Sequence, residues 1–440
     1  MNMNTQAMAM DHHWLPFTNN RAFRQNPQVF AKAKGVRYWT PEGDELLDGS
    51  SGLFCSAAGH GRPEIAEAVS RQLMELDYTP HFQRAAPVSF ELAERLAVLL
   101  PDGIDRVFFG ASGSEAVDSA MKIALAYHRA RGQGQRTRFV SRAWAYHGVN
   151  LGGTALAGMV GNRRDFSGAT CDVVHMRHTW SEDQRFTRGQ PDDGAHLADD
   201  LEEICKTYGP ETIAAVFVEP IAGSIGTIVP PKGYLARLRE IADRHGILLV
   251  FDEVITGFGR TGSAFAAQEF GVTPDIITMA KALTNGAVPM SAVGVKTEIQ
   301  DAVFAAAEGA DRPELMHGYT YSAHPVACAA ALAALNIFRD DGLFERSRAL
   351  SPVFLDAVFG LRNLPQVSDL RGYGMVAGVQ LTPGDQPGAK GMAVQRRLFD
   401  AGLHVKATGD ALILAPAFVA SESEIGQMAD ILRGVLGQAF

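Results

Sequence analysis

The sequence has few cysteines and none that are paired by spacing. Its 440 residues include four, and no C-x-x-C motif occurs among Cys55, Cys171, Cys205 and Cys328. Scattered thiols of this kind argue against a disulfide framework or a structural zinc site, and they are typical of a reducing compartment. We therefore expect a cytoplasmic protein.

Long apolar runs and dense basic blocks are also absent. No apolar run approaches the roughly 18 residues that a bilayer-spanning helix needs. The amino-terminal MNMNTQAMAMDHHWLPFT has neither the basic flank nor the apolar core of a secretory signal. The net charge is −9 and no Lys/Arg cluster occurs, which argues against a nucleic-acid partner. We expect a globular protein whose partners are small molecules, with no nucleic acid and no membrane.

Short apolar runs alternate with helical patterns between about positions 90 and 295. AAVFVEP (214–220), ILLVFDEV (247–254), DIITMAKAL (275–283) and SAVGV (291–295) are typical of buried strands. GYLARLREIADRHG (233–246) has apolar residues at helical spacing and ends on glycine. The alternation predicts an α/β fold: a mostly parallel sheet in a large domain, with helices on both faces. Such sheets bind ligands at the carboxyl ends of their strands.

The last quarter of the chain has a different pattern. An alanine-rich helical stretch, PVACAAALAALNIFRDDG, precedes strand-like MVAGVQL and ALILAP and a closing helical pattern. We interpret this region as a smaller α+β domain that is built from both termini. The predicted division is 1–64 for the amino-terminal part of the small domain, 65–325 for the large domain, and 326–440 for the carboxyl-terminal part of the small domain.

The stretch GASGSEAVDSAMK carries a first chemical signal. Ser112 and Glu115 have the S-x-x-E spacing of a capping box ahead of a helical run. Taken alone, that spacing indicates no more than a well-capped helix. Gly113 and Ser114 add small residues and a hydroxyl to the same turn, and free N–H groups at a helix start form an anion site suited to a phosphate.

Two charged residues follow neighbouring apolar runs. Asp252 ends ILLVFD, where an uncompensated buried carboxylate would be costly, and Lys281 follows DIITMA. Each could be a solvated residue at a strand end. Their separation is one strand–helix–strand unit, so both can reach the same crevice as the helix start. Together, an amine, a carboxylate and a phosphate-binding helix start suit pyridoxal 5′-phosphate. They match its aldehyde, its pyridinium nitrogen and its phosphate, respectively.

Five segments together resemble the class III aminotransferases of fold type I. They are LVFDEVITGFGRTG, DIITMAKALTNGAVPMSAV, ASGSEAVDSAMK, AYHG and HGYTYSAHPVACAAAL. Within that group the sequence is most similar to the ω-amino acid:pyruvate (β-alanine:pyruvate) transaminases, over nearly the whole chain. The resemblance implies pyridoxal 5′-phosphate as cofactor and transfer of an amino group from an ω-amino acid or an amine to pyruvate.

The resemblance also implies roles for single residues. Lys281 would be the Schiff-base lysine and the proton carrier, and Asp252 would pair the pyridinium nitrogen. The other cofactor contacts would come from Gly113, Ser114, Tyr146, Glu219, Val254 and Thr320. Of these, Thr320 would reach the phosphate of the other subunit, which implies a homodimer with shared active sites; dimer and tetramer both remain open.

For the substrate, the resemblance implies a pocket near Trp14, Phe17, Phe54 and Phe82. Lys406 stands where many ω-transaminases carry a mobile arginine. A lysine cannot make the planar two-point contact with a carboxylate, so the range of donors and acceptors stays open. Arg84 is an alternative carboxylate partner.

Other readings of the motifs remain. The same lysine and aspartate would serve a class III aminomutase, decarboxylase or phospho-lyase, and a catalytically silent binding relative is a further alternative. The GYGMVA stretch (372–377) fits G-x-G-x-x-A but precedes a strand, so it does not predict a dinucleotide loop. His175 and His178 have metal-like spacing without further ligands nearby, so we expect no metal.

Overall fold

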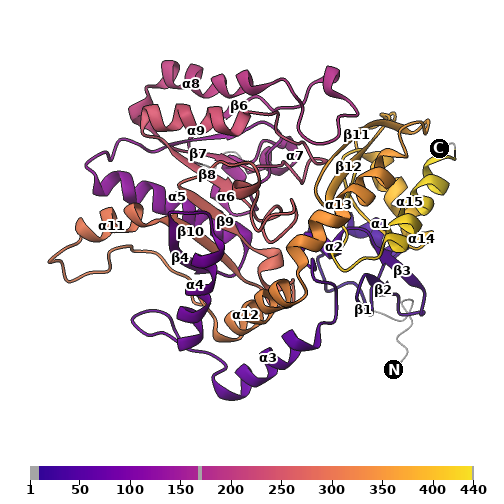
Figure 1. Ribbon diagram of the computed structural model, residues 1–440, viewed down its shortest axis with the longest axis horizontal. Helices are drawn as coiled ribbons and strands as arrows, with labels where there is room; N and C mark the ends of the chain where they lie inside the picture. Colours follow the sequence, from indigo (N-terminus) through magenta and orange to yellow (C-terminus); the bar gives the residue numbers. More distant parts are fainter. Residues whose placement is uncertain (1–8, 167–170, 439–440) are drawn as a thin grey trace.

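A computed structural model describes residues 9–166 and 171–438 of the chain. Its centre is a seven-stranded sheet, and the order across it is β4 (Ile104–Gly110), β10 (Ser291–Lys296), β9 (Ile276–Met279), β8 (Leu248–Asp252), β7 (Ile213–Val218), β5 (Arg138–Arg142) and β6 (Val173–Met176) (Figure 1). The five strands from β9 to β6 are parallel, whereas β10 runs antiparallel to both of its neighbours. The prediction of a mostly parallel sheet is confirmed.

Helices cover both faces of this sheet. In β8, Leu249 and Phe251 belong to the core cluster that contains the apolar side of α9 (Tyr234–His245). The alternate residues Leu248 and Val250 belong to the cluster with α5 (Gly113–Ala130). Successive side chains of a strand point to opposite faces, so a strand covered on both sides must be apolar throughout. That requirement explains the unbroken apolar runs of the central strands.

The two ends of the chain meet in a second sheet. Its order is β1 (Lys32–Lys34), β2 (Arg37–Trp39), β3 (Glu45–Asp48) and β13 (Leu403–His404), and β13 pairs in parallel with β3. A third sheet has the order β11 (Val367–Tyr373), β12 (Val376–Leu381), β15 (Ala411–Leu414) and β14 (Lys406–Thr408). The GYGMVA stretch includes the end of β11, the two-residue turn and the start of β12. These two small sheets lie together at one end of the molecule (Figure 1).

The remaining helices connect and cover the sheets. They are α1 (Asn20–Gln25), α2 (Ser51–Phe54), α3 (Pro63–Glu75), α4 (Pro87–Leu99), α6 (Leu151–Leu156), α7 (Val160–Arg163), α8 (Asp200–Tyr208), α10 (Ala266–Glu269), α11 (Thr297–Ala305), α12 (Pro325–Asp340), α13 (Leu343–Phe359), α14 (Ala389–Asp400) and α15 (Glu422–Leu436), with short 3₁₀ helices η3 (Glu182–Gln184), η4 (Ala195–Asp199), η5 (Pro210–Thr212) and η6 (Lys281–Thr284). Within the described residues, no helix is long and apolar enough to cross a membrane.

The sheet topology brings three chain segments to one edge. Because β10 is antiparallel to both β4 and β9, the latter two strands point the same way, and so does β8. The carboxyl ends of β4, β8 and β9 therefore lie on the same side of the sheet. The start of α5, Asp252 and Lys281 follow or occupy those ends.

Candidate active site

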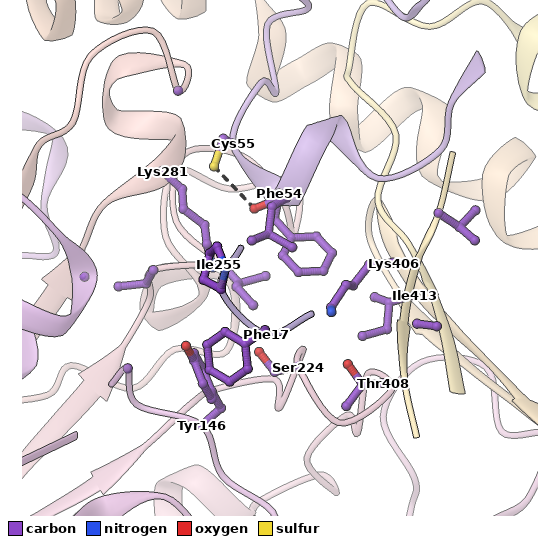
Figure 2. Close-up of a pocket in the computed structure, with 18 of the residues that line it drawn as sticks. Phe17, Phe54, Cys55, Tyr146, Ser224, Ile255, Lys281, Lys406, Thr408 and Ile413 are labelled. Atoms are coloured by element: carbon purple, nitrogen blue, oxygen red, sulfur yellow. Dashed lines mark hydrogen bonds between the residues drawn. The ribbon is translucent and has the colours of Figure 1, made fainter. Parts of the chain in front are cut away.

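A cavity of about 960 Å³ opens at this edge, and Figure 2 shows part of it. Lys281, Asp252 and the first residues of α5 all line it. So do the predicted cofactor contacts Tyr146, Glu219 and Val254. The structure thus brings together, in one space, the three chemical groups that lie far apart in the sequence.

Lys281 is the first residue of η6 and follows β9 by one residue. Its φ of 50° lies in the left-handed region, which is costly for a residue with a side chain and often marks a functional position. The amine Nζ lies 5.4 Å from the centre of the Phe54 ring. Burial lowers the pKa of Lys281, against the opposing charges of Cys55 and Asp252. A lowered pKa increases the fraction of neutral amine, which is the nucleophilic form.

Asp252 is buried and accepts three hydrogen bonds. The shortest comes from Nδ1 of His147 to Oδ2, at 2.7 Å. Oδ1 accepts from Thr278 Oγ1 at 3.1 Å and from the Val254 backbone N–H at 3.2 Å. Because a carboxylate only accepts, His147 must carry its proton on Nδ1. The other ring nitrogen, Nε2, is buried and has no partner among the described residues. The sequence did not identify His147 as the partner of Asp252.

The neighbouring acid, Glu253, has a different role. Its oxygens accept the backbone N–H groups of Ala266 (2.6 Å) and Ala267 (2.8 Å), and the Thr256 hydroxyl at 2.9 Å. Burial raises the pKa of Glu253 to about 7, although these hydrogen bonds oppose the shift. Glu253 is absent from the cavity lining and anchors the start of α10. Only one member of the acidic pair therefore faces the site.

The start of α5 forms half of the predicted capping box. Ser112 Oγ accepts the N–H of Glu115 at 3.2 Å, as expected. The Glu115 carboxylate instead accepts from the N–H of Ala111, at 2.6 Å, one residue beyond the expected partner. The first intrahelical bond runs from Ala116 to Ser112. The N–H groups of Gly113 and Ser114 precede it, so they have no partner within the helix.

Close packing explains two glycines around this turn. A Cβ on Gly113 would lie 3.2 Å from a methyl group of Val254, and one on Gly148 would lie 2.5 Å from Ser114 Oγ. Ser114 Oγ also accepts the N–H of Val149, at 3.0 Å. The turn is therefore held tightly against the loop that carries Tyr146.

Glu219 links that loop to the sheet. It follows β7 directly, is buried, and accepts the Tyr146 backbone N–H at 3.0 Å through Oε1. Burial raises the pKa of the Glu219 carboxyl group. It also raises the pKa of the Tyr146 phenol, with a smaller contribution from the charge of Asp252. Tyr146 points into the cavity in Figure 2.

The predicted substrate residues divide into two groups. Phe17, Phe54 and Lys406 line the cavity. Trp14 and Phe82 are 89% and 57% exposed and lie outside the lining, as does the exposed Thr320. Among the other lining residues, Ser224, Ile255, Thr408 and Ile413 carried no recognisable signal in the sequence.

His175 and His178 serve packing and hydrogen bonding. His175 Nε2 lies 3.1 Å from the Leu156 carbonyl oxygen, and His178 stacks on Trp144 with ring centres 3.5 Å apart. Across residues 9–166 and 171–438, no three His, Cys, Asp or Glu side chains are grouped to hold a metal ion.

The site fits pyridoxal 5′-phosphate. It offers a lysine whose lowered pKa favours the neutral amine, a carboxylate held by three hydrogen bonds, and helix-start N–H groups for a phosphate. An α/β sheet with this set at the carboxyl ends of its strands defines the class of pyridoxal-phosphate-dependent enzymes of fold type I.

Comparison with known proteins identifies the family. The model of the class-III aminotransferases matches residues 19–436, and the chain belongs to this pyridoxal-phosphate-dependent family. It is 50% identical over 432 residues to an omega-aminotransferase from Caulobacter vibrioides, covering 98% of each chain. It is 46% identical to a beta-alanine–pyruvate aminotransferase from Pseudomonas aeruginosa, over 96% of this chain and 95% of the relative.

Solved structures agree with this assignment. An (S)-enantioselective omega-transaminase from Thermomicrobium roseum superposes with a TM-score of 0.91 at 36% identity, over 97% of this chain and 96% of the other. The omega transaminase of Pseudomonas jessenii in complex with PMP has a TM-score of 0.91 at 30% identity, with 97% and 96% covered. The aminotransferase activity and the fold expected from the sequence are confirmed.

Proposed function

We propose that this aminotransferase moves an amino group from an ω-amino acid such as β-alanine, or from an amine, to pyruvate. The products are alanine and an aldehyde or oxo acid. The observation that carries the proposal is a single cavity that holds Lys281, Asp252 and, on its apolar wall, Lys406. The names of the relatives, which include beta-alanine–pyruvate and omega-amino acid–pyruvate aminotransferases, support the same substrates.

When bound, pyridoxal 5′-phosphate supplies an aldehyde that takes up the amino group and a ring that accepts electrons. Lys281 would hold that aldehyde and, once displaced, carry a proton to and from the substrate carbon that bears nitrogen. Its lowered pKa supports this role, because a base must be unprotonated before it can accept a proton. Asp252, fixed by His147 and Thr278, would keep a proton on the ring nitrogen.

The other cavity residues would bind and orient the cofactor. Gly113 and Ser114 would hold the phosphate with their free N–H groups, which carry the positive end of the α5 dipole. Tyr146 and Val254 would contact the ring, and Glu219 would keep Tyr146 in place through its backbone bond. Phe17, Phe54 and Lys406 would contact the substrate.

Lys406 is suited to recognise a carboxylate. It points into the cavity among Phe17, Phe54, Ile255 and Ile413 (Figure 2). It is partly buried, and no hydrogen bond or ion pair of its amine is found among the described residues. Burial lowers its pKa. A substrate carboxylate would offset the cost of partly burying this cation, whereas a plain amine donor would leave the cation without a partner.

We further propose a homodimer in the cytoplasm. Thr320 is exposed in the single chain, and its carbonyl oxygen accepts from the Tyr78 hydroxyl at 3.1 Å. Met316 (77% exposed) and Tyr321 (59%) lie close to it in the sequence, and Phe82 (57%) lies beside Gly318. Apolar surface of this kind is typical of a subunit interface. There Thr320 would reach the phosphate of the partner subunit; a tetramer would need a further interface.

A two-part experiment tests the function. Borohydride reduction of the purified holoenzyme, followed by peptide mapping, should place a pyridoxyl group on Lys281. Incubation with pyruvate and a panel of ω-amino acids and amines should yield alanine. A pyridoxyl group on another lysine would contradict the site assignment. Loss of carbon dioxide or phosphate, or an isomerised amino acid without alanine, would instead identify a different class III activity.

A further inference from the structure

The cavity extends beyond the residues assigned above, towards α14. Met392, Gln395, Arg396 and Phe399 line it, and their spacing of three, four and seven residues from Met392 puts them on one face of that helix. The amino-terminal segment, residues 16–30, also lines it, through Phe23, Gln28 and Phe30, among others. This outer part lies between α14 and a segment from the other end of the chain.

An aromatic contact joins these two chain segments. The rings of Phe30 and Phe399 lie 5.5 Å apart. Gln28 is two residues from Phe30, and Arg396 is three residues, about one helical turn, from Phe399. Gln28 and Arg396 therefore belong to the same two chain segments that this contact joins, and both line the cavity. Both aromatic rings are half-buried, so they present apolar surface to the cavity.

Two hydrogen-bond donors in this outer part have no acceptor. The Nε2 atom of Gln28 is buried and has no partner among the described residues. Arg396 is exposed, and within the same residues no hydrogen bond or ion pair of its guanidinium is found. A buried donor without a partner is uncommon in folded proteins and calls for an acceptor. A cation that lines the same cavity favours an acceptor that carries negative charge, and a carboxylate matches the planar guanidinium.

We propose that Arg396 and Gln28 form an outer subsite for the carboxylate of long-chain ω-amino acids. The inference rests on the proposed function, because it assumes that the amine end of the substrate reaches Lys281. Lys406 is partly buried and Arg396 is exposed, so the two cations stand at different depths of one cavity. Short donors such as β-alanine would place their carboxylate at Lys406, and longer ones would extend it past the aromatic rings to Arg396.

The lining of the outer part suits an elongated substrate. Phe23, Phe30 and Phe399 supply apolar surface along the outer part, against which a methylene chain can pack.

The test is a chain-length series with matched variants. kcat/KM is measured with pyruvate for β-alanine, ω-aminohexanoate, ω-aminooctanoate and ω-aminododecanoate, and for octylamine as an eight-carbon donor without a carboxylate. Arg396→Ala should lower the ratio of kcat/KM for ω-aminooctanoate to kcat/KM for β-alanine about fivefold, which is the upper range for a solvent-accessible ion pair. Gln28→Leu should lower the same ratio. Arg397→Ala removes an equal charge outside the cavity lining, and should leave both the ratio and the β-alanine rate unchanged.

Two further measurements separate this proposal from the general function. Added salt should lower the wild-type ratio of kcat/KM for ω-aminooctanoate to kcat/KM for octylamine, since an exposed ion pair is screened. Calorimetric titration of the holoenzyme with ω-hydroxyoctanoate, which has no amine to transfer, should show about fivefold weaker binding to Arg396→Ala than to wild type. Failure of every donor to form alanine would contradict the transamination while the titration still tests the subsite. An equal loss for octylamine and ω-aminooctanoate, or unchanged titrations, would overturn the subsite alone.

Discussion

Replacing Lys406 should affect carboxylate substrates far more than amines. Its ammonium is partly buried against apolar side chains, so a carboxylate brought beside it gains a charge-assisted contact worth about 1–2 kcal/mol. Lys406→Ala should therefore raise KM for pyruvate and β-alanine roughly five- to thirtyfold. The half-reaction with a plain amine needs no cation there and should be nearly unchanged. Stopped-flow measurement of each half-reaction separates the two effects.

The pH dependence provides a second readout for the same residue. Burial lowers the pKa of Lys406, so its charge is lost at a lower pH than that of an ordinary lysine. Carboxylate affinity should be complete below that lowered pKa and decrease as the pH rises through it. Lys406→Arg keeps its charge at all accessible pH values and should abolish the alkaline decrease, while retaining or improving carboxylate binding.

The free energy of unfolding should rise with pH, in contrast to the carboxylate affinity. A lysine whose folded-state pKa is lowered destabilises the fold while it is charged. This cost begins to decrease as the pH rises above the lowered pKa, and it is gone only above the ordinary lysine pKa of the unfolded chain. Lys406→Met, which keeps the bulk without the charge, should raise the free energy of unfolding at neutral pH by about 1 kcal/mol.

Equal KM changes for amines and carboxylates in Lys406→Ala would refute the assignment and favour another partner, such as Arg84.

Three more predictions follow from the site and its surroundings. Asp252→Asn should still fold, with a loss of about 1–2 kcal/mol in the free energy of unfolding, because His147 can accept from the amide after its proton moves to Nε2. Both half-reactions should nevertheless slow by about a hundredfold or more. Near-normal turnover would refute the assignment. Thr320→Ala should weaken the shift towards dimer that added cofactor produces in dilute samples, as measured by sedimentation; a fully active monomer that retains the cofactor would contradict the shared site. Because Glu253 is protonated more readily when folded, with a pKa of about 7, it should make stability decrease as the pH rises from about 4.5 to 7. Glu253→Gln should flatten that slope and cost about 1–3 kcal/mol at pH ~5, since its NH₂ group would face a backbone N–H; an unchanged slope in urea titrations would show that Glu253 is not the titrating group.

Much of the candidate active site at the edge of the central sheet could be predicted from the sequence, because its signals are local. Apolar runs identify strands buried on both faces, and alternating helices indicate parallel strands whose carboxyl ends share one side. Asp252, Lys281 and the start of α5 each stand at or directly after such a strand end. Their convergence therefore follows from strand order and direction alone, without knowledge of any side-chain contact.

The substrate side of the cavity was less predictable. Phe17 and Phe54 line it, whereas Trp14 and Phe82 do not, although all four are aromatic residues outside the central sheet. Aromatic residues serve cores, interfaces and binding sites alike, so composition cannot distinguish these roles. Thr320 lies on the surface of the single chain, where its proposed function depends on a second subunit.

The sequence by itself determined the fold class, the strand ends and the residues proposed for the chemistry, since periodicity and strand order depend on near neighbours. Tertiary structure decided the rest. Asp252 ends β8 and Glu253 follows it, and only the packing shows that Asp252 faces the cavity while Glu253 anchors α10. The His147–Asp252 bond joins residues 105 positions apart. Gln28 and Arg396 come from opposite ends of the chain, and they line one cavity only because the fold closes around it.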